Sequence, residues 1–187
     1  MGSTCRLFIA INIPSQVRNY LSEVQVALKR KNKRLDAKWV PAELVHITLY
    51  FLGDMDESAV PLIQAHIATA LAEVNAFTVQ LAALGGFPSA WRPRVIWMGL
   101  APSEALTNVH QSLAKEMMQL GIEVDPRPMA AHLTLARLRV PEPVEGFATR
   151  ITPVSWTVST IDFMESKLHP TGPTYTVLQS YALRSRR

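Results

Sequence analysis

Two short stretches of this chain share one pattern, and the expected fold is organised around them. Val45–Leu52 reads VHITLYFL, and Ala131–Leu138 reads AHLTLARL. Each stretch alternates apolar and polar residues around a His-x-Thr tripeptide, which predicts a strand with one face in the core. Because alternate side chains of a strand share a face, the histidine and threonine of each stretch point together, away from their apolar neighbours.

The segments that flank the two stretches recur in the same order. An apolar strand, a Pro-Ser helix start and a His-x-Thr strand occur in both halves, which indicates a duplicated lobe. The length of 187 residues suits one domain, or two small lobes that share a core. We therefore expect one bilobal domain over residues 1–187, with pseudo-repeats at about 5–90 and 93–185.

The expected elements alternate strands with helices, and the strand patterns favour an α+β fold with mainly antiparallel sheets. A Pro-broken connection at 141–153 is not expected to hold a long helix. Strands are expected at Arg6–Ile13, Lys38–Val40, Val45–Leu52, Phe77–Leu84, Arg94–Leu100, Ile122–Val124, Ala131–Leu138, Trp156–Glu165 and Tyr175–Leu183. Helices are expected from Ser15 towards the basic cluster Lys29–Arg34, at 57–74, and from Ser103 to about Leu120.

The paired histidines suit acid–base chemistry. Imidazole titrates near neutral pH, so one neutral ring can take a proton from an attacking group while the other, protonated, gives one to a leaving oxygen. The two threonine hydroxyls can hold the non-bridging oxygens of a phosphate. The alternative is that His46 and His132 are structural, each satisfied by a neighbouring hydroxyl. Their matching positions in two matching halves favour the functional interpretation.

Composition narrows the classes of function that the chain can have. The net charge of +4 weakly favours a polyanionic partner. The single cysteine, Cys5, excludes an intrachain disulfide and a Cys-rich metal cluster. A zinc site needs three or four ligands, which the two motifs do not supply, so we expect neither a metal nor another cofactor. No apolar run approaches 18 residues, and we expect a cytoplasmic, monomeric protein without a membrane span.

The motifs of this chain resemble those of the 2H phosphoesterase superfamily. They are most similar to the bacterial and archaeal RNA 2′,3′-cyclic phosphodiesterases, also called 2′-5′ RNA ligase-like proteins. The resemblance covers nearly the whole chain, through RLFIAINIP, HITLYFLG, FPSAWRPRVIWMGL, HLTLAR and FMESKLHPTGPTYTVL. Two residues depart from the family pattern: Ala131 stands where a proline is frequent, and Tyr50 where a small residue is common.

The resemblance implies two lobes, each an antiparallel sheet backed by helices, around a central cleft. It also implies hydrolysis of a 2′,3′-cyclic phosphate, on RNA or on a nucleotide, to a 2′-phosphate without a metal. By residue-for-residue match, His46 would protonate the departing 3′ oxygen and His132 would activate the water. Thr48 and Thr134 would hold the phosphate.

Two further family positions conflict with strict strand alternation. Arg137 matches the family arginine near the second motif, and Phe51 matches an aromatic residue that can stack on the base. Alternation places both on the face away from the histidines. They can reach the cleft only if each strand ends, twists or bulges after its threonine. If alternation holds, Tyr50 is the better stacking candidate and Phe51 packs in the core.

Two other functions compete with cyclic phosphate hydrolysis. Ligation of 2′-5′ RNA ends is a related transfer at the same phosphate, and a non-catalytic RNA-binding module with structural histidines is a third possibility. The products formed from a 2′,3′-cyclic phosphate separate the three. Outside the motifs, we expect Trp91, Trp97 and Trp156 to serve packing.

Overall fold

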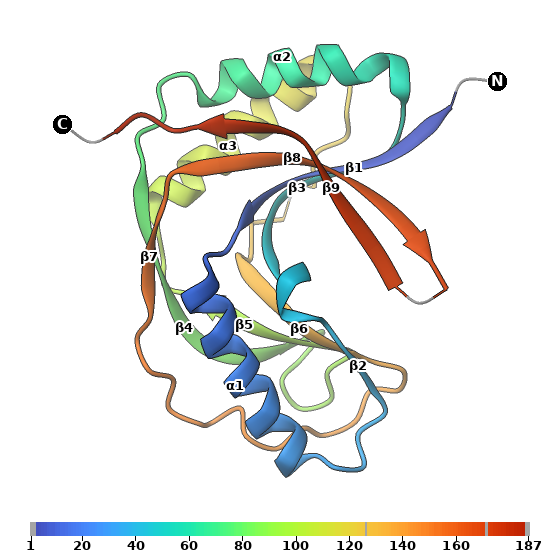
Figure 1. The fold of residues 1–187 in the computed structure, drawn as a ribbon, viewed down its shortest axis with the longest axis vertical. Helices are drawn as coiled ribbons and strands as arrows, with labels where there is room; N and C mark the ends of the chain where they lie inside the picture. Colours follow the sequence, from blue (N-terminus) through green and yellow to red (C-terminus); the bar gives the residue numbers. More distant parts are fainter. Residues whose placement is uncertain (1–2, 126, 171, 186–187) are drawn as a thin grey trace.

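Nine strands form one curved antiparallel sheet in the computed structural model, which describes residues 3–125, 127–170 and 172–185 (Figure 1). The strands are β1 (Thr4–Asn12), β2 (Ala37–Trp39), β3 (His46–Asp56), β4 (Phe77–Phe87), β5 (Val95–Leu100), β6 (His132–Leu138), β7 (Ser155–Val158), β8 (Thr160–His169) and β9 (Gly172–Ala182). The helices are α1 (Ser15–Lys31), α2 (Val60–Leu71) and α3 (Glu104–Gln119), with short 3₁₀ turns η1 (Ala42–Leu44) and η2 (Glu57–Ala59).

The two His-x-Thr strands lie side by side in the middle of this sheet. The strand order is β7-β4-β5-β6-β3-β1-β8-β9, with β2 added beside β6, and every pairing between these strands is antiparallel. The junction between β3 and β6 is short: its one register pair is Ile47 opposite Leu133, and both side chains are fully buried. The junction therefore joins a half of five strands, which includes β2, to a half of four strands through their apolar faces, one residue beyond each histidine.

The two halves of the sheet are built by exchange between the two halves of the chain. β1 and β3 are extended by β8 and β9, whereas β5 and β6 are extended by β4. Helices exchange as well: α3 follows β5 yet packs with α2 beside β3 (Figure 1). Helix α1 follows β1 yet packs on β6, where the buried Gln25 Nε2 donates to the carbonyls of Val40, at 2.8 Å, and Leu135, at 3.0 Å. The expected pseudo-repeats remain an interpretation of the sequence; in space their elements interleave.

Local sequence explains where the helices begin and end. The Ser103 hydroxyl accepts a hydrogen bond from the backbone N–H of Leu106 and caps α3, as the Pro-Ser signal predicts. Gly121 ends the same helix with φ +70°, a left-handed conformation that favours glycine. Helix α1 ends in Lys29, Arg30 and Lys31, whose charges complement the negative end of the helix dipole.

Three sequence-based expectations about local structure need correction. Ile122–Val124 is not a strand, because the Ile122 N–H turns back to the carbonyl of Met117. Trp156–Glu165 is not one strand but parts of the two strands β7 and β8, which are separated at Ser159. β7 pairs with β4, whereas β8 pairs with β1. Trp91 does not pack: it is 76% exposed on the connection between β4 and β5.

The expectations for the connection at 141–153 and for the fold class are confirmed. The connection at 141–153 holds no helix, and it covers α1 through bonds such as Asn32 Nδ2 to the Glu145 carbonyl at 2.9 Å. The fold is α+β, with two antiparallel halves backed by helices. Within the described residues, no helix is both long and apolar enough to cross a membrane.

Candidate active site

A bulge in β3 brings Phe51 onto the same face as the histidine. The register of β3 with β1 shifts between Thr48 and Tyr50, so Leu49 is an extra residue. Leu49 and Tyr50 are consequently both buried, while Phe51 is 51% exposed. Alternation is broken after the threonine, which is the condition under which sequence reasoning allowed Phe51 into the cleft.

Strand β6 carries the same bulge at the same position. Its register with β5 shifts between Thr134 and Ala136, so Leu135 is the extra residue. Leu135 and Ala136 are both buried, and Arg137 is exposed on the cleft face. The carbonyl of Leu135 accepts hydrogen bonds from the N–H of Val40 and from the α1 glutamine, which holds the bulge in place.

Tyr50 lies outside the cleft, so its alternative role as the stacking residue is wrong. The bulge turns its side chain to the opposite face, where the side chain is 6% exposed. Its hydroxyl donates to the carbonyl of Glu123 at 3.1 Å, and its ring lies 6.2 Å from that of His110 on α3. Tyr50 therefore packs the α3 side of the sheet.

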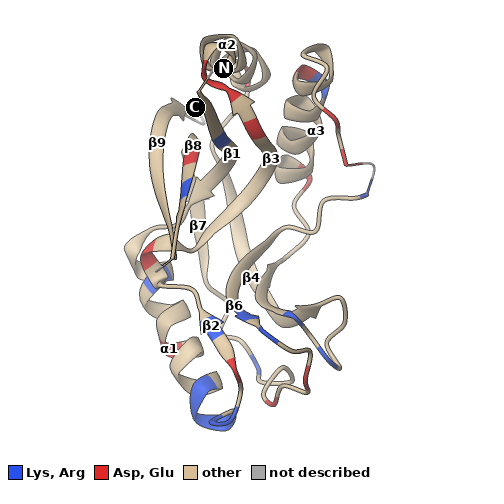
Figure 2. Cartoon of the chain, turned by 90° about the vertical axis from the view of Figure 1, so that its right-hand side faces the viewer, with Lys and Arg blue, Asp and Glu red and all other residues tan. Residues whose placement is uncertain are grey.

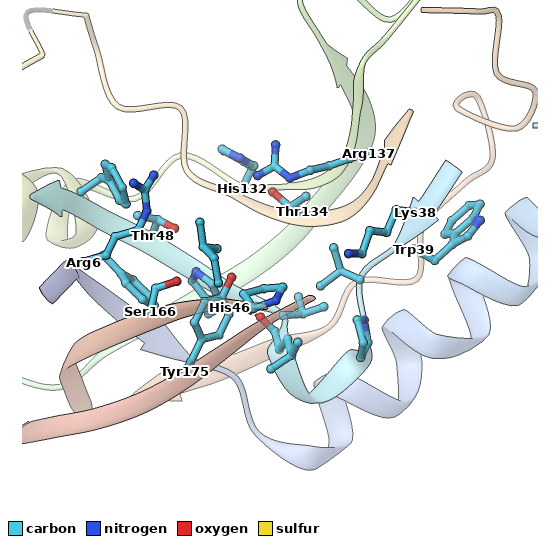
Figure 3. A pocket seen from close by; sticks show the side chains of 18 residues that line it. Arg6, Lys38, Trp39, His46, Thr48, His132, Thr134, Arg137, Ser166 and Tyr175 are labelled. Atoms are coloured by element: carbon cyan, nitrogen blue, oxygen red, sulfur yellow. Dashed lines mark hydrogen bonds between the residues drawn. The ribbon is translucent and has the colours of Figure 1, made fainter. Parts of the chain in front are cut away.

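One cavity of about 390 Å³ collects the motif residues of both strands (Figure 3). The predicted residues that line it are His46, Thr48, Phe51, His132, Thr134 and Arg137. Other polar or aromatic residues on its wall are Arg6, Phe8, Lys38, Trp39, Ser166 and Tyr175. The cavity lies along the β3–β6 junction, so residues 86 positions apart in the chain face one space.

The two imidazoles are held in the same way. His46 Nδ1 lies 2.8 Å from the carbonyl oxygen of Leu44, and His132 Nδ1 lies 2.6 Å from that of Ala130. A carbonyl oxygen only accepts, so each Nδ1 carries the proton and donates it. The neutral ring then has its lone pair on Nε2, the nitrogen that is available to the cavity. Each ring is thus preset to take or give a proton at Nε2.

Aromatic walls fix each ring, but the two walls differ. The His46 ring lies 5.1 Å from the centroid of Phe8 and 5.2 Å from that of Tyr175, the latter edge-on at 89°. The His132 ring lies 5.0 Å from Phe87, also edge-on, and 6.2 Å from Trp97. These contacts limit rotation of the rings and exclude water from one side of each.

Burial governs the protonation of both histidines. Removal from water lowers the pKa of His46 and that of His132, because it disfavours the charged imidazolium. The carbonyl bonds oppose this and raise both pKa values. The smallest contributions differ: the other imidazole lowers the pKa of His46, whereas the guanidinium of Arg137 lowers that of His132.

Sequence reasoning missed Arg6 as a cavity residue. Its guanidinium lies 4.6 Å from the centroid of the Phe51 ring, and it also pairs with Asp54 at 3.6 Å. Arg6 opens an apolar strand, yet its alternation with Phe8 and Ala10 places it on the cleft face. Ser166 and Tyr175 were also missed as site residues, although both lie within the quoted C-terminal family stretch.

Metal-ligating side chains do not gather at this site. Among the described residues, no group of three or more His, Cys, Asp or Glu side chains is close enough to hold one ion. Independence from metal remains a prediction for chelation experiments.

Comparison with known proteins assigns the family. A model of the 2′-5′ RNA ligase superfamily matches residues 13–170. The chain belongs to this superfamily. A Thermus thermophilus protein named RNA 2′,3′-cyclic phosphodiesterase is a relative of this chain. It is 34% identical over 190 residues, which cover 96% of this chain and 90% of the relative. One from Thermotoga maritima with the same name is 30% identical over 176 residues, which cover 92% of each chain.

Solved structures show the same fold for this 2′-5′ RNA ligase superfamily member. A crystal structure of a Thermus thermophilus protein superposes with a TM-score of 0.82 at 30% identity and covers 97% of this chain and 100% of its own. E. coli LigT complexed with 3′-AMP has a TM-score of 0.79 at 24% identity and covers 97% of this chain and 99% of its own. At that identity, the LigT comparison supports the fold alone.

Proposed function

We propose that this protein hydrolyses the 2′,3′-cyclic phosphate at RNA ends, or on nucleotides, to a 2′-phosphate. The observation that carries the proposal is the pair of imidazoles on one cavity, each with Nδ1–H bound to the carbonyl two residues before it. A threonine hydroxyl two residues after each histidine faces the same space. Relatives named RNA 2′,3′-cyclic phosphodiesterase support this choice among phosphate chemistries.

The proposed reaction is one in-line displacement with two proton transfers. Neutral His132 Nε2 takes a proton from water as the water oxygen attacks phosphorus. The bond from phosphorus to O3′ breaks, and protonated His46 gives its Nε2 proton to O3′. The product carries a 2′-phosphate and a free 3′-hydroxyl. Thr48 and Thr134 donate hydrogen bonds to non-bridging oxygens, and Arg137 balances the charge that develops there.

The charges around the two rings favour His132 as the base. Base catalysis needs a neutral ring, and the nearby cation of Arg137 disfavours protonation of His132 in addition to burial. His46 has no guanidinium among the causes that lower its pKa. A bound phosphodiester carries negative charge and stabilises an imidazolium, which restores the proton that His46 must donate.

The substrate charge is met by hydroxyls, imidazoles and Arg137, so we propose that no cation is needed. The proposed partner is RNA with a 2′,3′-cyclic phosphate end or a cyclic nucleotide. A monomeric state and a cytoplasmic location remain predictions from the sequence.

Product analysis in the presence of EDTA tests the function. The purified chain is incubated with a nucleoside 2′,3′-cyclic phosphate, and with an RNA that ends in one, together with an RNA that begins with a 5′-hydroxyl. The expected product is a 2′-phosphate, formed in EDTA at the same rate as without it. Joined 2′-5′ ends would indicate ligation, and binding without turnover would indicate a binding module. Loss of activity that a divalent metal restores would show that the chemistry is misassigned.

A further inference from the structure

A second aromatic and basic surface lies at the end of the cavity away from Arg6. Lys38 and Trp39, on β2, form this surface, and both line the cavity (Figure 3). Figure 3 shows them on the opposite side of His46 from Arg6. The site therefore has two ends, one with Arg6 over Phe51 and one with Lys38 beside Trp39, with the histidines between them.

Lys38 forms an unbalanced pair of cations with Arg137. The two residues are directly opposite each other on β2 and β6, and directly opposite residues share a face. Like charges in this arrangement repel and destabilise a sheet. Among the described residues, neither side chain forms an ion pair with a carboxylate, whereas Arg139 nearby pairs with Asp36. An anion bound between them would offset this repulsion.

Two neighbouring cations, Lys38 and Arg137, can hold two phosphate groups. The proposed mechanism uses Arg137 at the scissile phosphate, which leaves the Lys38 ammonium for another anion. Lys38 extends towards Gly172 at the start of β9, where an added Cβ would lie 3.6 Å from its Nζ. Opposite residues of neighbouring β-strands have Cα atoms about 4.5–5.5 Å apart. The two cations are therefore placed for neighbouring phosphates of one RNA chain.

The half-buried Trp39 contributes to the cavity wall, although it is opposite the buried Ala136 on β6. The Lys29 ammonium of α1 lies 5.2 Å from the centroid of the Trp39 ring, and the same indole lines the cavity. Aromatic rings combined with cations are the usual platform for single-stranded nucleic acid. Figure 2 shows Lys and Arg positions on β2, on β6 and at the C-terminal end of α1, so positive charge continues outward from this end.

We propose that Lys38 and Trp39 form a subsite for the upstream nucleotide of an RNA substrate. The phosphodiester between the last two nucleotides binds Lys38, and the penultimate base stacks on Trp39. This inference rests on the proposed function, and it assigns the terminal base to the Phe51 end of the cavity. It names the substrate class of the site: RNA ends of at least two nucleotides rather than cyclic mononucleotides.

The test compares two substrates that share a terminal base. One is adenosine 2′,3′-cyclic phosphate, and the other is a diadenosine dinucleotide that ends in a 2′,3′-cyclic phosphate. The wild-type chain is expected to favour the dinucleotide by about 10- to 100-fold in kcat/KM, since one stacked base and one phosphate contact are added. Trp39→Ala should lower this ratio by about 5-fold or more, through KM of the dinucleotide.

Lys38 is tested by its salt dependence. Lys38→Ala should make the slope of log(kcat/KM) against log salt concentration less negative by about 0.7 for the dinucleotide, because one phosphate contact of a single strand is lost. Matched controls lie outside the cavity: Lys115→Ala for the charge and Trp91→Ala for the indole. Both controls should leave the substrate ratio and the slope unchanged.

The outcomes separate this inference from the function on which it rests. If neither substrate is hydrolysed, the proposed function fails. If both are hydrolysed equally well, or if Trp39→Ala lowers both rates alike, the upstream subsite is wrong and the function stands. Trp39→Leu keeps apolar burial without a stacking face, so turnover of the mononucleotide by this variant shows that it has folded. A Trp39-dependent joining of a 5′-hydroxyl oligonucleotide would assign the surface to a second strand and overturn the proposal.

Discussion

The motif strands β3 and β6 have the same backbone geometry but carry different side chains at the end of the motif. In both, the histidine donates Nδ1–H to the carbonyl two residues earlier, and a bulge at the third residue after the histidine turns the fifth residue into the cleft. That fifth residue is Phe51 in β3 and Arg137 in β6. The repeated geometry thus presents an apolar ring on one side of the cleft and a cation on the other.

The residue at one equivalent position gives the two motif strands different tasks. The His46 side offers Phe51, a surface suited to a base, whereas the His132 side offers Arg137, a group suited to phosphate. The cation also sets the two imidazoles apart, since it lowers the pKa of His132 and not that of His46. In the proposed mechanism, the residue at one equivalent position separates base-binding from charge-balancing, while burial, the largest cause, lowers the pKa of both histidines.

Replacement of the histidines should produce the largest effect. His46→Ala and His132→Ala should each lower kcat by roughly 10²–10⁴-fold on a cyclic phosphate, since each carries one proton transfer. The double variant should lose far less than the product of the two losses, because one member of an acid–base pair does little alone. Steady-state rates on one cyclic nucleotide check both statements.

A substrate with a better leaving group shows which histidine is the acid. An activated ester needs no proton at its departing oxygen, so it should partly rescue His46→Ala and leave His132→Ala slow. Rescue of His132→Ala instead would reverse the two roles. A near-normal rate in either single variant on the cyclic phosphate would remove that histidine from the mechanism.

Loss of the cation should have the next largest effect. Arg137→Ala should lower kcat/KM by about 10- to 100-fold on mononucleotide and RNA substrates alike, because a charge-assisted contact to phosphate is worth about 1.5–3 kcal/mol. Arg137→Lys should recover part of the loss by keeping the charge without the bidentate geometry. Arg139→Ala, which removes a cation already paired with Asp36, is the matched control and should change little.

Arg137→Ala should also shift the dependence of kcat/KM on pH. Arg137 lowers the pKa of His132, so its removal raises that pKa. The base must be neutral to act, and the acid-side limb of kcat/KM against pH should therefore shift to higher pH. Arg137→Lys should leave this limb in place. An unshifted limb in Arg137→Ala would mean that His132 is not the base that titrates there.

Loss of the apolar ring should have a smaller and more selective effect. Phe51→Ala should raise KM by roughly 5- to 30-fold, since a stacked base contributes about 1–2 kcal/mol, and should leave kcat nearly unchanged. Phe51→Trp should retain binding. Tyr50→Phe is the control on the opposite face: it loses a hydrogen bond to the Glu123 carbonyl and about 1 kcal/mol of stability, with no change in KM.

The smallest effect concerns stability against pH. Burial lowers the pKa of both histidines below the unfolded value of about 6.5, so the unfolded state binds more protons below that pH. Stability should be complete above pH ~6.5 and fall as the pH drops through the folded pKa values. Urea unfolding at pH 8 and pH 5 measures this loss, which His46→Gln should reduce. An equal loss in wild type and in that variant would assign it to other groups.

Much of the site could be predicted from the sequence because it follows strand alternation. His46, Thr48, His132 and Thr134 are each two apart within an apolar pattern, so their common face is a direct consequence of the pleat. The family resemblance pointed to Phe51 and Arg137 against that rule. Their places depend on bulges, and no residue type at the bulge marks it, since both extra residues are ordinary leucines.

Other features were hidden because they depend on long-range pairing. Arg6 belongs to the cleft because β1 lies beside β3, and Tyr175 because β9 is added beyond β8. Trp39 and Lys38 reach the cavity because the short strand β2 pairs with β6. These contacts join segments far apart in the chain, and local periodicity carries no information about them.

The exchange of helices and outer strands between the two sheet halves makes the chain equivalent to a domain-swapped dimer whose subunits are fused end to end. The first helix after the opening strand of each half is exchanged: α1 covers β6, and α3 lies beside β3. A chain cut in the connection at 90–93 would give two fragments that are each incomplete, yet each would supply the strand and helix that the other lacks. Mixing such fragments would restore the cleft only where both are present, so the two histidines depend on one shared folding event.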